Sequence, residues 1–175
     1  LIDSVPAIKV SPVVENEEIF GLEAGYRFVI PNFTVNLNGY YTSWANRFLL
    51  FNGTYSDNNI EGAYLITGIK QLHKGLELDF QAQVLPQWMI RGYGSIGDWQ
   101  YDGSSPFRFR EEVNSEIIGN GQLPLSGVKI GNAPQTSFGL GTKYDILSNL
   151  SVDVDFNFYT NLYAQVDPED VVESV

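Results

Sequence analysis

Hydrophobic and polar residues alternate through long stretches of the chain, and the clearest of these is LSVDVDFNFYTNLY, residues 150–163. Successive side chains of a β-strand point to opposite faces of its sheet. The stretch therefore predicts a long strand with one apolar face and one polar face. The apolar positions are Leu150, Val152, Val154, Phe156, Phe158 and Leu162.

The same alternation recurs upstream and predicts six antiparallel strands, which short turns join into three hairpins. The strands cover residues 18–30, 33–45, 60–85, 89–101, 134–146 and 150–163. Two longer segments separate the hairpins, at residues 46–59 and 102–133. Both are rich in Gly together with Asn, Asp, Pro or charged residues, and this composition predicts long loops.

These strands predict one domain over residues 18–165, with an extended lead-in at 1–17 and a loop at 166–175. The strand at 89–101 is the weakest, because three glycines interrupt its alternation. Ile90 and Ile96 indicate its apolar face. No helical period appears, so the expected fold class is all-β.

The apolar faces predict either a membrane β-barrel or a soluble β-sandwich, because both folds alternate apolar and polar residues. Three features favour the barrel. The strands reach the roughly 9–11 residues that cross a bilayer, and short turns alternate with long connections as in outer-membrane barrels. Aromatic residues also lie near strand ends, as in the girdles of such barrels. They are Tyr26, Phe28, Phe33 and Tyr41.

Composition narrows the function classes. The net charge of −11 argues against a nucleic-acid partner, which needs a clustered basic surface. The absence of Cys and the single His argue against disulfides and against a zinc site. No run of 18 apolar residues predicts a transmembrane helix. We find no nucleophile, phosphate-loop or metal motif, so we expect no catalytic residues, no metal site, no cofactor and no enzymatic activity.

Four segments together resemble TonB-dependent outer-membrane receptors, in the form found in Bacteroidetes. Their order and spacing carry the resemblance, which covers about residues 15–165. The segments are ENEEIFGLEAGYRF (15–28), LNGYYTSWANRFL (37–49), HKGLELDFQAQVLPQWMIRGYGSIGDWQYDG (73–103) and NAPQTSFGLGTKYDILSNLSVDVDFNFYTNLYA (132–164).

This resemblance implies an antiparallel transmembrane β-barrel segment, about six strands from the C-terminal half of a barrel of about 22 strands. It implies a location in the outer membrane of a Gram-negative bacterium and uptake of a scarce ligand such as a ferric siderophore. The expected partners are outer-membrane lipid, the remaining strands and plug of the same receptor, and TonB, which would act through a plug that lies outside this chain. Loops 46–59 and 102–133 would face outside. The alternative is a soluble or surface-exposed β-sandwich binding module, for example one that binds carbohydrate. A barrel enzyme is a third possibility.

Six charged residues on the polar faces are expected to line the lumen. They are Glu23, Arg27, Glu77, Asp79, Asp153 and Asp155. Asp153 and Asp155 also resemble the paired carboxylates of a glycosidase. They lie in mid-strand among Ser and Asn with no candidate partner nearby in sequence, so lumen lining is the preferred interpretation.

A second group of residues forms a candidate ligand-binding site at the expected extracellular rim, where a strand ends and a long loop begins. Its members are Asp98, Trp99, Tyr101, Arg108 and Arg110. Arginines bind anionic chelates by charge-assisted hydrogen bonds. The preferred interpretations are instead interface-belt aromatics for Trp99 and Tyr101, and a solvated loop in which the arginines pair with Glu111 and Glu112. The single histidine, His73, is interpreted as structural in preference to a ligand contact.

Overall fold

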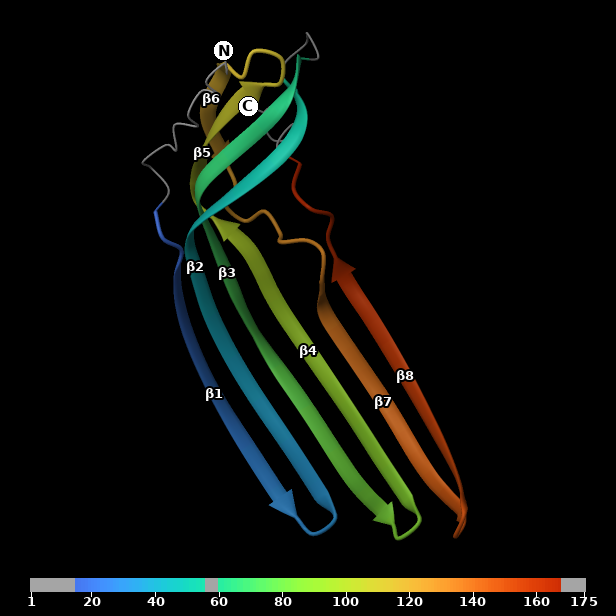
Figure 1. The fold of residues 1–175 in the computed structure, drawn as a ribbon. Coiled ribbons are helices and arrows are strands. Elements are labelled where there is room, and N and C mark those ends of the chain that lie inside the picture. Colours follow the sequence, from blue (N-terminus) through green and yellow to red (C-terminus); the bar gives the residue numbers. More distant parts are fainter. Residues whose placement is uncertain (1–14, 56–59, 168–175) are drawn as a thin grey trace, which may run out of the picture.

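The computed structural model of the chain describes residues 15–55 and 60–167, and these form an all-β, antiparallel structure (Figure 1). Eight strands make up one sheet. They are β1 (Glu18–Ile30), β2 (Phe33–Tyr55), β3 (Ile60–Leu85), β4 (Trp88–Asp102), β5 (Ser104–Glu111), β6 (Ile117–Pro124), β7 (Pro134–Leu147) and β8 (Leu150–Leu162). The predicted fold class and the three long hairpins are confirmed. In the described part of the chain, no helix has the length and apolar character needed to cross a membrane.

The long strands lie side by side in the order β1-β2-β3-β4-β7-β8, and the sheet is open, with β1 and β8 at its edges. The short turns at residues 31–32, 86–87 and 148–149 all lie at the lower end of the sheet in Figure 1. At the upper end, β5 pairs with the beginning of β3, and β6 pairs with β5.

The prediction of two long loops between the hairpins is wrong in large part, because strands occupy much of both segments. β2 continues through most of residues 46–59, and Gly53 lies opposite Gly62 of β3. Asn and Gly suggested turns there, but the glycines are accommodated within the strand ladder. Residues 102–133 contain the β5–β6 hairpin. The predicted lead-in and terminal loop lie mainly outside the described residues, as do residues 56–59.

Two bulges change the phase of the alternation in the upper half of the sheet. The register shifts between Trp44 and Arg47 of β2, where Asn46 has φ 59°, and shifts again at Gly68 of β3, with φ 66°. An extra residue in a strand reverses the faces to which all later side chains point. One face of the sheet, here called the inner face, is polar below the bulges and apolar above them.

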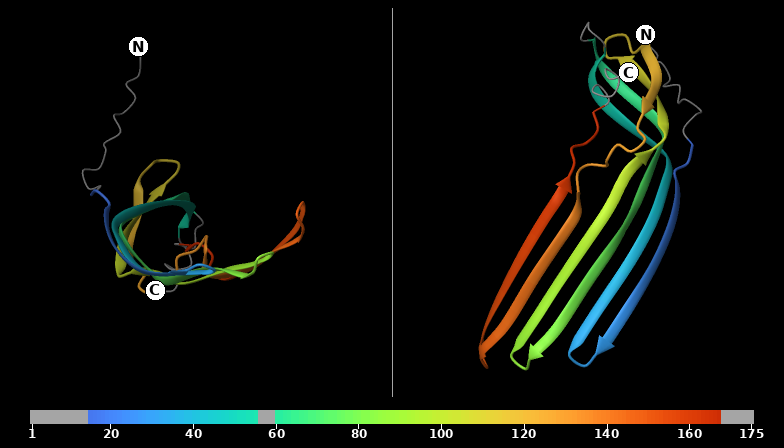
Figure 2. Two further views of the ribbon diagram at one scale, coloured as in Figure 1. Left: turned by 90° about the horizontal axis from the view of Figure 1, so that it is seen from below. Right: turned by 180° about the vertical axis from the view of Figure 1, so that it is seen from behind.

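The apolar upper part of the inner face forms the only cluster of buried hydrophobic residues that the described chain contains. Its members are Tyr64, Ile66, Ile69, Tyr101, Phe107, Phe109, Leu123 and Leu125. Phe109 has no exposed surface, and its ring lies 4.7 Å from that of Tyr64 and 5.0 Å from that of Tyr55. Figure 2 shows the upper strands curling round toward one another.

The lower part of the sheet is a single layer. Its outer face, opposite the inner face, carries the apolar side chains of all six long strands, and no described residue covers it as a second layer. Leu22 is 62% exposed, and Val154 and Phe156 are each 56% exposed. Ile90 and Ile96 pair with Ala82 and Leu76, so the apolar phase predicted for β4 is confirmed.

Truncating the core tests whether residues 102–133 form packed structure. We expect Phe109→Ala to lower the free energy of unfolding by about 3–5 kcal/mol, because it removes a fully buried ring and leaves a cavity. Arg108→Ala is the matched control, because its side chain lies on the exposed face of the same strand; its effect should stay within about 0.5 kcal/mol. Denaturant unfolding of the full-length protein measures both. Equal effects would contradict the packed hairpin.

Candidate functional site

The polar part of the inner face is the candidate functional site, and the strand register assembles it. Glu23 and Arg27 of β1 lie opposite Tyr40 and Asn36 of β2. From Asn36 a row of paired positions runs through Asp79, Tyr93 and Gly139 to Asn157 of β8. The register places all six residues predicted to line a lumen on this face, namely Glu23, Arg27, Glu77, Asp79, Asp153 and Asp155.

Arg91 of β4 is the centre of the charged network on this face. Its Nη2 atom lies 2.7 Å from Asp153 Oδ1 and 2.7 Å from Asp155 Oδ2, and Nη1 donates to Asp153 Oδ2 at 3.2 Å. The guanidinium crosses β7 at Gly141, where a Cβ atom would lie 2.8 Å from Arg91 Nε. The two aspartates therefore have a shared cationic partner, which sequence reasoning missed. A pair of carboxylates that shares one cation in this way is suited to a structural role.

A second bridge crosses β7 one row higher. Tyr93 Oη donates to Asn157 Oδ1 at 2.8 Å and lies 3.3 Å from Tyr159 Oη. Gly139 leaves room for it, because a Cβ there would lie 2.9 Å from Tyr93 Cζ. The side chains of β4 thus reach β8 twice across the intervening strand.

Aromatic residues mark the junction between the polar face and the core above it. Trp99 Nε1 donates to Tyr40 Oη at 2.8 Å, and this contact passes over Gly75 of β3. The His73 ring lies 5.7 Å from that of Trp99. The nearby Arg47 guanidinium lies 4.0 Å from the Trp44 ring, and its Nη1 donates to Gln71 Oε1 at 2.6 Å. We call Tyr40, Trp44, His73 and Trp99 the aromatic belt.

The structure does not bring the predicted rim residues together. Trp99 lies on the inner face, and Tyr101 is 5% exposed within the core. Asp98 points to the outer face, because adjacent strand residues point to opposite sides. Its carboxylate lies 2.5 Å from Lys129 Nζ and 3.1 Å from Lys74 Nζ. The lysines, Lys129 first, lower the pKa of Asp98.

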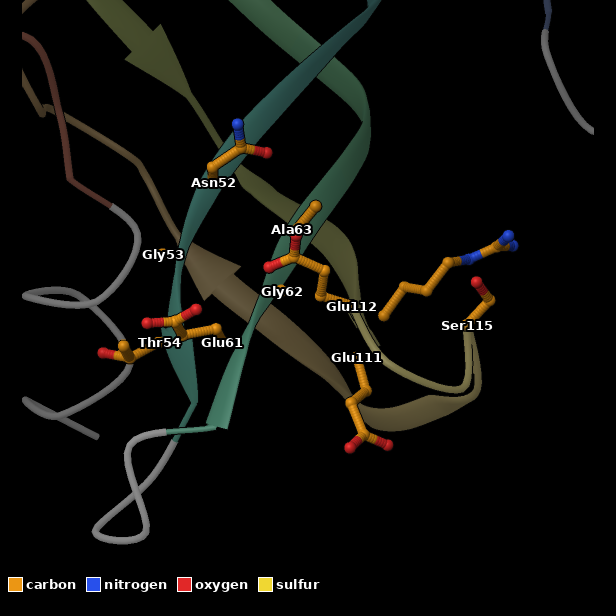
Figure 3. A pocket seen from close by; sticks show the side chains of 10 residues that line it. Asn52, Gly53, Thr54, Glu61, Gly62, Ala63, Glu111, Glu112 and Ser115 are labelled. Carbon is orange, nitrogen blue, oxygen red and sulfur yellow. The ribbon is translucent and has the colours of Figure 1, made fainter.

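Arg108 and Arg110 lie on the exposed side of β5, and the buried Phe107 and Phe109 point the other way. The ion pairs expected with Glu111 and Glu112 do not form: within the described residues neither arginine has a salt-bridge partner. Arg110 instead lines an open hollow of about 530 Å³ at the upper end of the sheet (Figure 3). Asn52, Thr54, Glu61, Glu111, Glu112 and Ser115 also line it.

The described residues contain no group of three or more His, Cys, Asp or Glu side chains that could hold a metal ion. Comparisons with known proteins found no family model, no curated protein and no solved structure that matches this chain. The candidate site is therefore interpreted from its own geometry.

The Arg91 network generates a stability prediction. Arg91→Gln leaves two carboxylates on one strand without their cation, so we expect the β7–β8 hairpin to be destabilised through repulsion. Arg27→Gln is the matched control, because the described residues give Arg27 no ion pair. Thermal unfolding of the full-length protein should show a lower midpoint for the first variant only. Adding Asp153→Asn and Asp155→Asn to Arg91→Gln should recover part of the loss; no recovery would show that repulsion is not the cause.

His73 generates a pH prediction. Its Nε2 is buried and has no hydrogen-bond partner in the described part of the chain. Burial lowers the pKa of His73, and the charge of Arg47 lowers it further. The stability gained from neutral His73 is complete above its unfolded pKa of about 6.5 and declines as pH falls below that value. NMR titration should give a pKa below that reference, and His73→Gln should flatten the fall in stability between pH 7 and pH 5. A titration at or above the reference would contradict the burial of this ring.

Proposed function

We propose that the six long strands are part of the wall of an outer-membrane β-barrel, with lipid on the outer face and a water-filled path along the inner face. The observation that carries the proposal is the continuous apolar outer face, which spans all six strands and is uncovered in the described chain. Large exposed apolar surfaces mark contact with another apolar phase or partner. A β-sandwich would need a second sheet over this face, and no described residue supplies one.

The height of the apolar band supports the proposal. On β1 it extends from Phe20 to Ile30, and ten steps of about 3.4 Å cover about 34 Å along the strand. At the tilt of about 45° that membrane strands adopt, this length spans about 24 Å, close to the ~25 Å apolar band of such barrels. The proposed spanning segments are residues 20–30, 33–41, 76–85, 88–96, 138–147 and 150–158.

Charged residues bound the band from above. The last apolar pair on β3 and β4 is Leu76 opposite Ile96, and the next outward pair is Lys74 with Asp98. Beyond Leu72 and Gln100, Lys70 lies opposite Asp102, with its Nζ 2.8 Å from Asp102 Oδ2. Outward positions that change from apolar to mainly charged and polar side chains are typical of the boundary between hydrocarbon and headgroups.

The open edges suit a larger barrel. β1 and β8 each have one unpaired side in the described structure. Unpaired edges promote aggregation in water and cannot be tolerated in lipid, where every backbone group needs a partner. We propose that further strands of the same protein pair with both edges.

The finer proposal rests on the sequence resemblance to TonB-dependent receptors. In it, the inner face and the aromatic belt guide a scarce polar ligand such as a ferric siderophore, and a plug outside this chain couples uptake to TonB. Hydrogen-bonding and aromatic groups from four strands are available for transient contacts with such a ligand. Loss of uptake in cells that lack TonB would support this finer proposal, and unchanged uptake would exclude it.

Single cysteines on β7 test the membrane proposal, and the chain has none of its own. We expect Ser137→Cys, on the inner face, to react with a water-soluble maleimide in intact membranes. Leu140→Cys, 54% exposed on the outer face, should react at least about tenfold more slowly because lipid excludes the reagent.

A maleimide dissolved in the bilayer supplies the control and should reverse this order. Equal reaction of both cysteines with the water-soluble reagent would show that the outer face is solvated. Failure of Leu140→Cys to react with either reagent would show that another protein layer covers it. Either result would exclude the membrane wall.

A further inference from the structure

The outer face has a preformed groove in the middle of its apolar band. Gly92 and Gly94 of β4 both lie on this face, but only the space above Gly92 is filled by a neighbouring side chain. The Phe80 ring covers Gly92, where a Cβ would lie 2.6 Å from Phe80 Cε1, whereas no atom lies within 4 Å of a Cβ at Gly94. The resulting groove has a volume of about 270 Å³. Its apolar walls are Leu37, Leu76, Leu78, Ile96 and Phe138.

Cationic side chains lie above this groove on the same face. Lys74 and Lys129 both contact Asp98, and Lys70 contacts Asp102. Three ammonium groups therefore meet two carboxylates, which leaves an excess of one positive charge in a chain whose net charge is −11. Lys74 lies four residues along β3 from Leu78, the partner of Gly94, so about 13 Å separate the ammonium level from the groove floor.

We propose that this groove binds one acyl chain of an anionic lipid, whose phosphate group contacts Lys74 and Lys129. The apolar groove and the positive charge above it match the two ends of such a molecule, and this inference rests on the proposed membrane location. Ammonium groups bind phosphate as point charges. The groove offers the acyl chain contacts on both sides, which a flat apolar surface cannot provide.

Lipid binding to the full-length protein tests the site. The purified protein in detergent is titrated with phosphatidylglycerol and with phosphatidylcholine of identical acyl chains, and bound lipids are counted by native mass spectrometry. We expect one phosphatidylglycerol to bind at least about fivefold more tightly than phosphatidylcholine, a difference of about 1 kcal/mol. Gly94→Leu should weaken both lipids because it fills the groove, and Leu76→Ala should weaken both by removing a wall. Lys74→Gln should remove only the preference for phosphatidylglycerol.

Two variants are the controls. Val154→Leu adds bulk to the same apolar face on β8, and Lys143→Gln removes an ammonium group on the inner face; both should bind lipid like the unmodified protein. Unchanged binding by Gly94→Leu and Leu76→Ala would overturn the groove, and equal affinity for the two lipids would overturn the headgroup contact. A dimer displaced by Gly94→Leu would assign the groove to a second copy instead. These failures differ from failure of the membrane location itself, which the β7 cysteines report independently.

Discussion

The polar face of this sheet depends on one steric constraint: a side chain reaches the second strand away only if the strand between has no side chain in the way. Neighbouring strands are about 4.8 Å apart, so such a contact spans nearly twice that distance. Glycine provides the passage for Arg91 at Gly141 and for Tyr93 at Gly139. Tyr40 and Trp99 meet in the same way over Gly75. These bridges link strands that backbone pairing leaves unconnected, in a lower sheet for which the described residues supply no second layer. Glycines weaken an isolated strand, but here they allow the sheet to be braced across its width.

The two bulges in β2 and β3 determine which side chains of these strands lie on the inner face in the upper half of the sheet. Without them, Phe48, Leu50 and Leu65 would face inward in place of Leu49, Phe51, Tyr64 and Ile66. With Asn46 and Gly68 in positive-φ conformations, Tyr64 and Ile66 face inward and join the core that the β5–β6 hairpin closes. The aromatic belt lies at the height where the change occurs. On the proposed membrane wall, the outer end of the inner face is therefore bounded by packed structure that presents Trp and Tyr side chains.

Alternation alone predicts the six long strands, their short turns and the face to which each side chain points, because a period of two is a local property. It fails where the period is interrupted. Asn46 suggests a loop, although it is one extra residue in a continuing strand. The segment FRFR at 107–110 alternates and could have indicated β5, but the Gly and Pro residues around it dominated the interpretation.

The candidate site is less predictable because its contacts join distant parts of the chain. Arg91 and Asp153 are separated by 62 residues and by a whole strand in space. No local pattern encodes such a partner; the register and a glycine together create it. The sequence also suggested a contact that the structure lacks. Asp98 is next to Trp99 in the chain, which suggested a shared site, but strand geometry puts the two side chains on opposite faces.

The two faces of β8 depend on each other if the outer face lies in lipid. Val154 points outward between Asp153 and Asp155, which point inward to Arg91. Lipid on one side lowers the local dielectric, so both the attraction within this cluster and the cost of an unpaired carboxylate grow. Asp153 and Asp155 lie two residues apart on the same face of one strand, so without a cation their charges would repel each other. Arg91 reduces this repulsion from β4 by compensating one of the two negative charges, and Gly141 is the position that lets it do so. If β8 faces lipid, it thus needs apolar side chains on its outer face and, on its inner face, the bridge from Arg91 to its two carboxylates.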